Sequence, residues 1–326
     1  MKVAIIGFGS IGNRHLKNLL KLGIQNIVIV SEHLSESEFI FNGKIFHVVN
    51  DIKLVINSID IMVISNPTNQ HFKYLNLAIA NKVNAYIEKP IACNLDQVNE
   101  ISKIVPDNEI ILAVGTQFRF NKLILKLKEL IDNDYFGHIL SVVSSHGEHI
   151  ADYHPGENYK SSYTANKNQC GGVLLTQIHH IDYLEWLFGP FTHAFANEIV
   201  SPSLEIDVDA VINFSLVCSE TNLQVHGHMN YLQRPKSTTL SIIGESASAF
   251  WNSEENTISL VSNQEIIKEQ IHQERNEMFL MAMNNFIDSI KSSSQPAANI
   301  GDGIRSIKIV ECIKRSISSG QVEKIT

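Results

Sequence analysis

The first third of the chain alternates short apolar runs with stretches of helical periodicity. Each run is long enough for one buried strand, and between the runs apolar residues recur three or four positions apart, as on one face of a helix. Strands separated by helices indicate βαβ units and a parallel sheet. The expected strands are residues 2–6, 25–30, 43–49, 60–65, 83–87 and 109–114, and the expected helices are residues 11–22, 72–81 and 94–104.

Beyond about Phe118 the pattern changes. In residues 208–216 and 223–231 apolar and polar positions alternate with a period of two, which predicts antiparallel strands with one covered face. We therefore expect a doubly wound parallel sheet in residues 1–118, followed in residues 119–326 by an α/β domain with an open, largely antiparallel sheet. Its other expected elements are strands 137–145, 240–244, 247–251 and 257–261, helices 122–132, 174–188, 274–291 and 301–318, and a long irregular stretch at 146–169.

Composition excludes several classes of partner. The net charge of −8 argues against nucleic acid and against an anionic membrane surface. No apolar run approaches the roughly 18 residues of a membrane span, and the first apolar run is too short for a signal peptide. The four cysteines are scattered without a C-x-x-C pair, so we expect them to pack as small apolar thiols in a cytoplasmic protein.

A glycine triplet lies between the first expected strand and the first expected helix. Gly7, Gly9 and Gly12 allow a tight turn and close approach to a pyrophosphate, and the backbone of Ser10 and Ile11 begins the helix that would bind it. Glu32 ends the next strand, about 20 residues on, where a carboxylate binds a ribose 2′-OH and repels a 2′-phosphate. The pattern predicts an NAD site, with NADP less favoured; the alternative is a glycine turn that binds no ligand.

Polar residues follow two later strands of the same sheet. The stretch Asn66–His71 contributes Asn66, Pro67 and His71, and Glu88 and Lys89 precede Pro90. The carboxyl ends of parallel strands meet at one edge, so we expect these residues beside the cofactor, although His71 could instead be packed locally. Lys89 could donate to a reacting oxygen and stabilise a developing alkoxide.

The predicted helix 174–188 carries a second candidate pair. His179 and Asp182 are three positions apart on one helix face and could converge on one ligand, with the histidine as proton acceptor. By default such a pair is a surface hydrogen bond. His180 is expected to point away from this face.

Together these stretches resemble the glucose–fructose oxidoreductase, inositol dehydrogenase and rhizopine-catabolism (Gfo/Idh/MocA) family over essentially the whole chain. The matching segments are IIGFGSIGNRH, NPTNQH, EKP, GGVLLTQIHHIDYLEWLFG, YLQRP and ERNEMF. The resemblance implies an N-terminal Rossmann domain, a C-terminal α/β domain whose free sheet face often buries a partner subunit, and hence a homodimer or homotetramer. It assigns Lys89 and His179 as catalytic and Asp182 as an aspartate that helps to bind substrate. Many members carry an aspartate one turn before the histidine, where this chain has Leu175 and Thr176.

The loop Tyr153–Lys167 resembles that of family members in bacterial surface-sugar and sialic-acid-type pathways. Tyrosine rings and cationic groups suit a polyhydroxylated, anionic ligand such as a sugar or nucleotide sugar. The candidate substrate residues are Arg119, Tyr153, Tyr159, Lys160, Tyr163 and Arg234. For each one alone, a solvated surface residue is the alternative.

These features predict an NAD-dependent dehydrogenase acting on a sugar carbinol. One alternative is an NAD-dependent glycosidase or epimerase in which oxidation is transient, and another is a non-catalytic NAD-sensing regulator. His146, His149, His154, His179 and His180 raise the question of a zinc site, but no H-E-x-x-H or cysteine pair is present, so we expect no metal.

Overall fold

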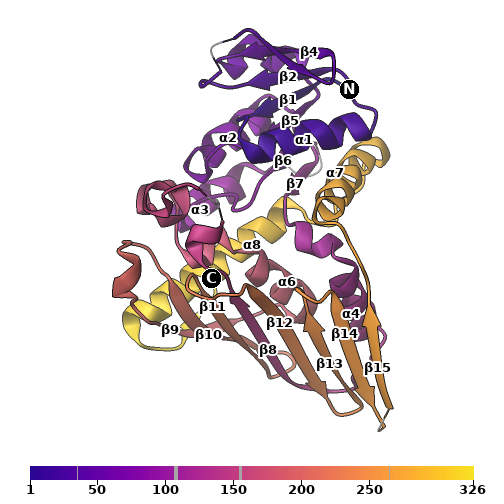
Figure 1. The fold of residues 1–326 in the computed structure, drawn as a ribbon, viewed down its shortest axis with the longest axis vertical. Coiled ribbons are helices and arrows are strands. Elements are labelled where there is room, and N and C mark those ends of the chain that lie inside the picture. The colour runs from indigo at the N-terminus through magenta and orange to yellow at the C-terminus, as the bar shows by residue number, and fades with distance from the viewer. Residues whose placement is uncertain (35, 106–108, 154–155, 264) are drawn as a thin grey trace. The chain divides into compact units, whose positions relative to one another are not determined.

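The computed structural model describes residues 1–34, 36–105, 109–153, 156–263 and 265–326 (Figure 1). It forms two compact units. The first comprises Met1–Gln117 and Arg275–Ile304, and the second comprises Phe118–Glu274 and Arg305–Thr326. The sequence predicts a boundary at nearly the same place, but it assigns residues 275–304 to the second domain rather than to the first unit.

The first unit contains a seven-stranded sheet. Its strands are β1 (Val3–Ile6), β2 (Ile27–Val30), β3 (Glu38–Phe41), β4 (Lys44–Val49), β5 (Ile61–Ile64), β6 (Asn84–Ile87) and β7 (Leu112–Val114), in the order β3-β4-β2-β1-β5-β6-β7. All pairs are parallel except the β3–β4 hairpin, whose first strand the sequence pattern does not reveal. The helices are α1 (Ser10–Lys21), α2 (His71–Ala80), α3 (Leu95–Ile104) and α7 (Arg275–Ser292).

Strand β1 is the point at which the strand order reverses. It pairs with β2 on one side and with β5 on the other, both in parallel. All four residues of β1, and all four of β2 and β5, are buried, as expected for a parallel sheet covered on both faces. In open sheets of this kind ligands bind beyond the carboxyl end of the strands at such a switch point. The fold thus places the chain after Ile6 at the position where a ligand is expected.

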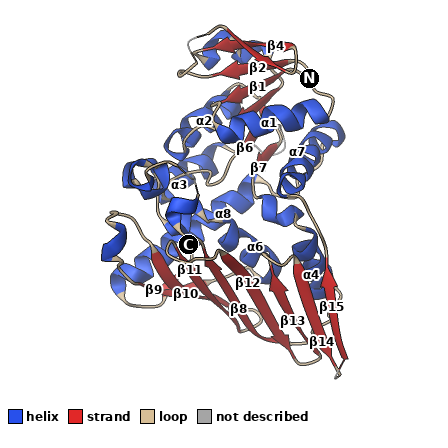
Figure 2. Ribbon diagram, in the orientation of Figure 1, coloured by secondary structure: helices blue, strands red, loops and turns tan. Residues whose placement is uncertain are grey.

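The second unit contains a nine-stranded sheet in the order β15-β14-β13-β12-β8-β11-β10-β9-β16. Of the described pairs in this sheet, only β8 and β11 are parallel. Helices α4 (Lys122–Asp132), α6 (His179–Phe188) and α8 (Ile300–Ser319) lie on one side of this sheet (Figure 2). The strands are β8 (Ile139–Gly147), β9 (His193–Glu198), β10 (Val211–Cys218), β11 (Leu223–Asn230), β12 (Ser237–Gly244), β13 (Ala247–Asn252), β14 (Thr257–Ser262), β15 (Glu265–Gln270) and β16 (Glu323–Lys324). The mostly antiparallel, one-sided sheet confirms the fold class predicted from the sequence.

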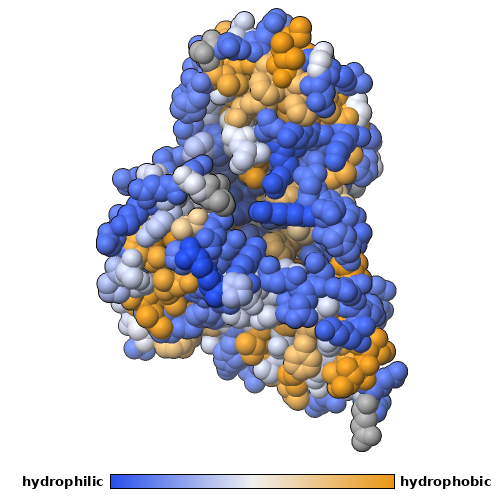
Figure 3. All heavy atoms as spheres, viewed as in Figure 1, coloured by the Kyte–Doolittle hydropathy of each residue, from blue (hydrophilic) through white to orange (hydrophobic). Residues whose placement is uncertain are grey.

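On the opposite face of this sheet the described residues form no helix layer. Its central row crosses eight strands in register: Phe195, Ser215, His226, Val143, Ser241, Phe250, Ser259 and Lys268. The apolar members of the row are well exposed, Phe195 at 45%, Val143 at 48% and Phe250 at 43%. Hydrophobic side chains interrupt the hydrophilic surface over the sheet strands (Figure 3). The open face is therefore mixed in character rather than uniformly polar.

The predicted helix 174–188 is broken into two. Helix α5 (Val173–Thr176) ends before Gln177, and α6 begins at His179. The hydroxyl of Thr176 donates to the Gly172 carbonyl oxygen at 2.8 Å, a side-chain bond to the preceding turn that bends helices. The predicted core face is nevertheless correct, since Ile178, Ile181, Leu184 and Leu187 are all buried.

The cysteines are of two kinds. Cys218 and Cys312 are free and buried, as the sequence predicts. Cys93 and Cys170 are each disulfide-bonded, so the expectation that all four are thiols is wrong for these two.

Within the described residues no helix has both the length and the apolar character needed to cross a bilayer.

Candidate functional site

The glycine turn after β1 has the geometry that a dinucleotide phosphate requires. Gly7 has φ +81°, and a Cβ there would lie 2.6 Å from the Asn66 Cα atom. A Cβ on Gly12 would lie 2.2 Å from the Gly7 carbonyl oxygen, whereas a Cβ on Gly9 would meet no heavy atom within 4 Å. The chain is thus closely packed around Gly7 and Gly12, whereas the space next to Gly9 is open.

Helix α1 begins directly at this opening. Its N-cap is Gly9, which has no side chain to cap the helix. Ser10 is exposed and Ile11 is partly exposed at the first turn. Backbone N–H groups at such a terminus, together with the helix dipole, favour an anion. The residues present therefore fit the pyrophosphate of a dinucleotide.

Glu32 lies just beyond the end of β2 and is exposed. Ser31, between the strand and Glu32, is buried, and its N–H donates to the Val49 carbonyl oxygen at 2.9 Å. The strand end is thus held in the sheet while the carboxylate of Glu32 stays accessible, as binding of a ribose hydroxyl requires.

The loop after β5 places His71 against backbone rather than in open space. Its Nδ1 atom lies 2.7 Å from the Pro90 carbonyl oxygen, and its Nε2 atom lies 2.8 Å from the Asn66 carbonyl oxygen. Burial lowers the pKa of His71, while the two carbonyl contacts oppose that shift. The ring ties the loop that contains Asn66 and Pro67 to the turn at Pro90. Among the described residues the buried Oδ1 atom of Asn66 has no hydrogen-bond partner and remains able to accept from a ligand.

Glu88 and Lys89 follow β6. The Glu88 carboxylate accepts a hydrogen bond from Nε2 of His15 at 2.8 Å, and both side chains are buried. A Cβ on Gly115 would lie 3.0 Å from this carboxylate, so the glycine leaves room for it. Burial lowers the pKa of Lys89 to about 8, although the charge of Glu88 raises it. Lys89 thus titrates near pH 8 rather than above pH 10, which suits a residue that exchanges or donates protons.

In the second unit His179 lies in an aromatic cluster. Its ring is stacked on that of Phe118, with centroids 4.6 Å apart and planes inclined by 5°. The His180 ring is 4.5 Å from it and is itself stacked on His146 at 4.0 Å. His179, His180 and His146 are all buried. Contact with Phe118 and His180 therefore fixes the orientation of the His179 ring.

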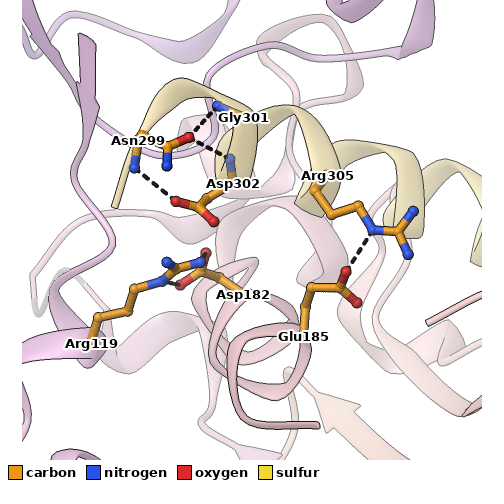
Figure 4. Close-up of polar contacts among 7 residues, drawn as sticks. All are labelled: Arg119, Asp182, Glu185, Asn299, Gly301, Asp302 and Arg305. Carbon is orange, nitrogen blue, oxygen red and sulfur yellow. Dashed lines mark hydrogen bonds and ion pairs between the residues drawn. The ribbon is translucent and has the colours of Figure 1, made fainter. Parts of the chain in front are cut away.

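Asp182 and Arg119 form a buried two-point ion pair (Figure 4). Arg119 Nε donates to Asp182 Oδ2 at 2.9 Å, and Nη2 donates to Oδ1 at 2.8 Å. The side chains are only 4% and 1% exposed, so little of either charge is neutralised by solvent. The same helix contributes Glu185, which accepts from Arg305 Nε at 2.6 Å. These pairs fix α6 and with it His179.

The loop tyrosines differ in their surroundings. The Tyr153 hydroxyl accepts from Gln177 Nε2 at 2.6 Å, and burial raises the pKa of Tyr153. The Tyr159 hydroxyl donates to the Leu204 carbonyl oxygen at 3.1 Å. Tyr163 is 43% exposed and remains accessible to a ligand.

The loop cations are paired with carboxylates. Lys160 forms an ion pair with Glu205. Arg234 donates from Nε and Nη2 to Asp152, both at 2.8 Å. Both pairs are solvent-exposed, and a ligand would have to compete with the carboxylates for these side chains.

No group of three or more His, Cys, Asp or Glu side chains that could hold a metal ion is found in the described residues. His154, one of the histidines considered from the sequence, lies outside them. His146 Nδ1 is hydrogen-bonded to Thr238 Oγ1 at 2.9 Å, and His149 Nδ1 accepts from the Ala151 N–H at 3.3 Å.

Two residues near the candidate groups were not predicted from the sequence. Phe118 carries no signal in the sequence that connects it to His179. His15 does carry one, since it occupies a position on the apolar stripe of the first helix, where a histidine needs a buried partner.

The chain matches known proteins along most of its length. Residues 1–116 match the NAD-binding Rossmann fold of an oxidoreductase family, and residues 128–326 match that family's C-terminal α/β domain. It is 24% identical to the uncharacterized oxidoreductase YrbE of Bacillus subtilis, over 97% of this chain and 94% of that protein. It is 22% identical to myo-inositol 2-dehydrogenase of Thermotoga maritima, over 100% of this chain and 98% of that protein.

Solved structures show the same fold. Levoglucosan dehydrogenase in complex with NADH has a TM-score of 0.87 at 17% identity, covering 100% of this chain and 99% of that chain. The WlbA dehydrogenase from Bordetella pertussis, in complex with NADH and UDP-GlcNAcA, has a TM-score of 0.83 at 16% identity, covering 100% and 98%. Since both halves of the chain match, the protein is an oxidoreductase with an NAD-binding Rossmann domain and belongs to the Gfo/Idh/MocA family.

Proposed function

We propose that the protein moves a hydride between a carbinol of a sugar or nucleotide sugar and NAD, in the metabolism of bacterial surface sugars in the cytoplasm. The observation that carries the proposal is Lys89, a half-buried lysine with a pKa of about 8 that follows the carboxyl end of a Rossmann strand. Relatives named inositol 2-dehydrogenase and glucose-6-phosphate 3-dehydrogenase support a polyol or sugar substrate. The likeness to WlbA supports a nucleotide sugar.

Each group has a role in this proposal. The glycine turn binds the phosphates, and Glu32 binds the adenosine ribose and disfavours a 2′-phosphate. When bound, NAD supplies the hydride acceptor. Protonated Lys89 donates to the substrate oxygen and stabilises negative charge on it, and His179 takes the hydroxyl proton. Asp182 contributes to substrate binding with its charge balanced by Arg119.

The experiment is a search for the substrate. Sugars and nucleotide sugars are screened for thermal stabilisation of the protein in the presence of NAD, and stabilising compounds are then tested for NADH formation. Net NADH accumulation is the expected result. A compound that is converted without net NADH would identify a glycosidase or epimerase, and binding without conversion would favour a regulator.

We also propose that the open face of the nine-stranded sheet joins subunits into a homodimer or homotetramer. It is unusual for a face that only solvent covers to expose three large apolar side chains in one row, those of Phe195, Val143 and Phe250. In a two-fold interface each side chain is buried twice, and burial of one such side chain is worth about 1.5–3 kcal/mol.

Phe250→Glu should therefore dissociate the oligomer, as measured by sedimentation velocity. The matched control is Ile40→Glu, which introduces the same charge at a 67% exposed position on β3 of the other sheet and should leave the oligomer intact. If Phe250→Glu sediments as the wild type does, the open face is not the interface.

A further inference from the structure

Among the residues that the structure describes, two arginines differ from the others in having no carboxylate partner. Four of the six are in ion pairs: Arg119 with Asp182, Arg234 with Asp152, Arg305 with Glu185 and Arg315 with Glu323. In the described part of the chain Arg14 and Arg275 are in no ion pair, and the buried Nη1 atom of Arg14 has no hydrogen-bond partner. A buried donor without an acceptor is costly, so its retention calls for an explanation.

The fold brings these two arginines to the same place. Arg14 lies on α1, one turn beyond the glycine turn, and Arg275 is the first residue of α7. The two helices lie side by side (Figure 1), and Asn276 Nδ2 donates to Asn18 Oδ1 at 2.8 Å. The Arg14 guanidinium lies over the Phe279 ring, 4.4 Å from its centroid. A guanidinium that lies over an aromatic ring keeps its N–H groups, which lie in its own plane, for hydrogen bonds.

Lys89 belongs to the same group of charges. Burial lowers the pKa of both Arg14 and Lys89, and the positive charge of Arg275 lowers both further. Glu88 is the carboxylate that acts on both in the opposite direction. Its carboxylate already accepts from His15 at 2.8 Å. Arg14 and Lys89 are thus both subject to the charges of Glu88 and Arg275.

We propose that Arg14 and Arg275, beside Lys89, form a binding subsite for a carboxylate or phosphate group. Arginine edges match such groups geometrically, and hydrogen bonds between charged groups are roughly twice as strong as neutral ones. The anionic group belongs either to an acidic substrate or to the bound dinucleotide. The first alternative rests on the proposed function. The loop cations Lys160 and Arg234 are poorer candidates because each is already paired with a carboxylate.

The test measures the binding of inorganic phosphate by calorimetry, first without and then with saturating NADH. The variants are Arg14→Gln and Arg275→Gln, and the matched control is Arg315→Gln on α8 of the second unit. Without NADH, each of the first two should weaken phosphate binding roughly tenfold, the effect of losing one charge-assisted contact. Arg315→Gln should bind as the wild type does, and melting curves verify that all variants are folded.

The NADH arm distinguishes the two sources of the anion. If the variant-sensitive phosphate binding persists with NADH bound, the subsite serves the substrate. If NADH abolishes it and the two variants also weaken NADH binding, the subsite serves a cofactor phosphate. Equal phosphate affinity in wild type, Arg14→Gln and Arg275→Gln would overturn the proposal. Because no turnover is needed, this result is independent of whether the protein oxidises a sugar.

Discussion

Replacing Lys89 by methionine is expected to lower kcat/KM roughly 10²- to 10⁴-fold while leaving NADH affinity nearly unchanged. Methionine fills a similar volume but cannot donate a proton or carry charge, so the developing alkoxide loses its stabilising partner. The effect is measured by steady-state kinetics on the substrate found in the screen. Lys82→Met is the matched control, since Lys82 is an exposed lysine paired with Glu109 and should tolerate the change.

The pKa of Lys89 predicts how kcat/KM depends on pH on the alkaline side. Its pKa is lowered to about 8, so the protonated form predominates below that pH and is lost above it. Because protonated Lys89 is the active form in the proposed mechanism, wild-type kcat/KM should fall above about pH 8. The residual activity of Lys89→Met should lack this decline. A decline that is equally steep in the variant would show that another group titrates.

Replacing His179 by alanine is expected to have the second large effect on turnover. The imidazole is the proposed proton acceptor, and its loss should also lower kcat roughly 10²- to 10⁴-fold. Removal of the buried ring leaves a gap beside Phe118, so the melting temperature is expected to decrease as well. Binding of NADH, which the first unit provides, should be retained.

A further variant separates the chemical role of His179 from its role in packing. His179→Phe keeps a ring to stack on Phe118 but cannot accept a proton, so it should restore stability without restoring turnover. His47→Ala, at an exposed position on β4, is the control for loss of a histidine elsewhere. Substantial turnover by His179→Phe would exclude His179 as the proton acceptor.

The sequence predicts best what depends on neighbours in the chain. The glycine turn needs only Gly7, Gly9 and Gly12 where a strand passes into a helix; Gly7 and Gly9 lie between β1 and α1, and Gly12 lies in the first turn of α1. Lys89 lies two residues beyond the end of strand β6, close to the strand end that the sequence predicts. Period-two alternation predicted the character of the second sheet, because that pattern reports burial on one face directly.

Pairings between distant residues could not be predicted. Arg119 and Asp182 are 63 residues apart, and His15 and Glu88 are 73 residues apart. Sequence reasoning placed Asp182 beside His179 on one helix face and treated Arg119 as a separate substrate contact. The ion pair that joins them follows from tertiary packing, which no local spacing reveals.

Dependence on tertiary contacts also explains the other differences between the predicted and the observed fold. The sequence 174–188 has a continuous apolar stripe, but the helix is interrupted at Gln177, next to Thr176, whose hydroxyl donates to the Gly172 carbonyl oxygen. Strand β15 is exposed at nearly every position and has no alternation to detect. Residues 275–304 follow the second sheet in the chain yet pack with the first unit, which only tertiary contacts show.

Transfer of a hydride from a carbinol carbon to NAD is the central claim, and an isotope measurement tests it most directly. The substrate identified by the screen is prepared with deuterium on the reacting carbon, and the NADH formed is analysed by mass spectrometry. We predict one deuterium in each reduced nicotinamide, with formation greatly slowed in Lys89→Met and His179→Ala. Reduced cofactor without deuterium, or conversion of the substrate with the cofactor left oxidised, would contradict the account.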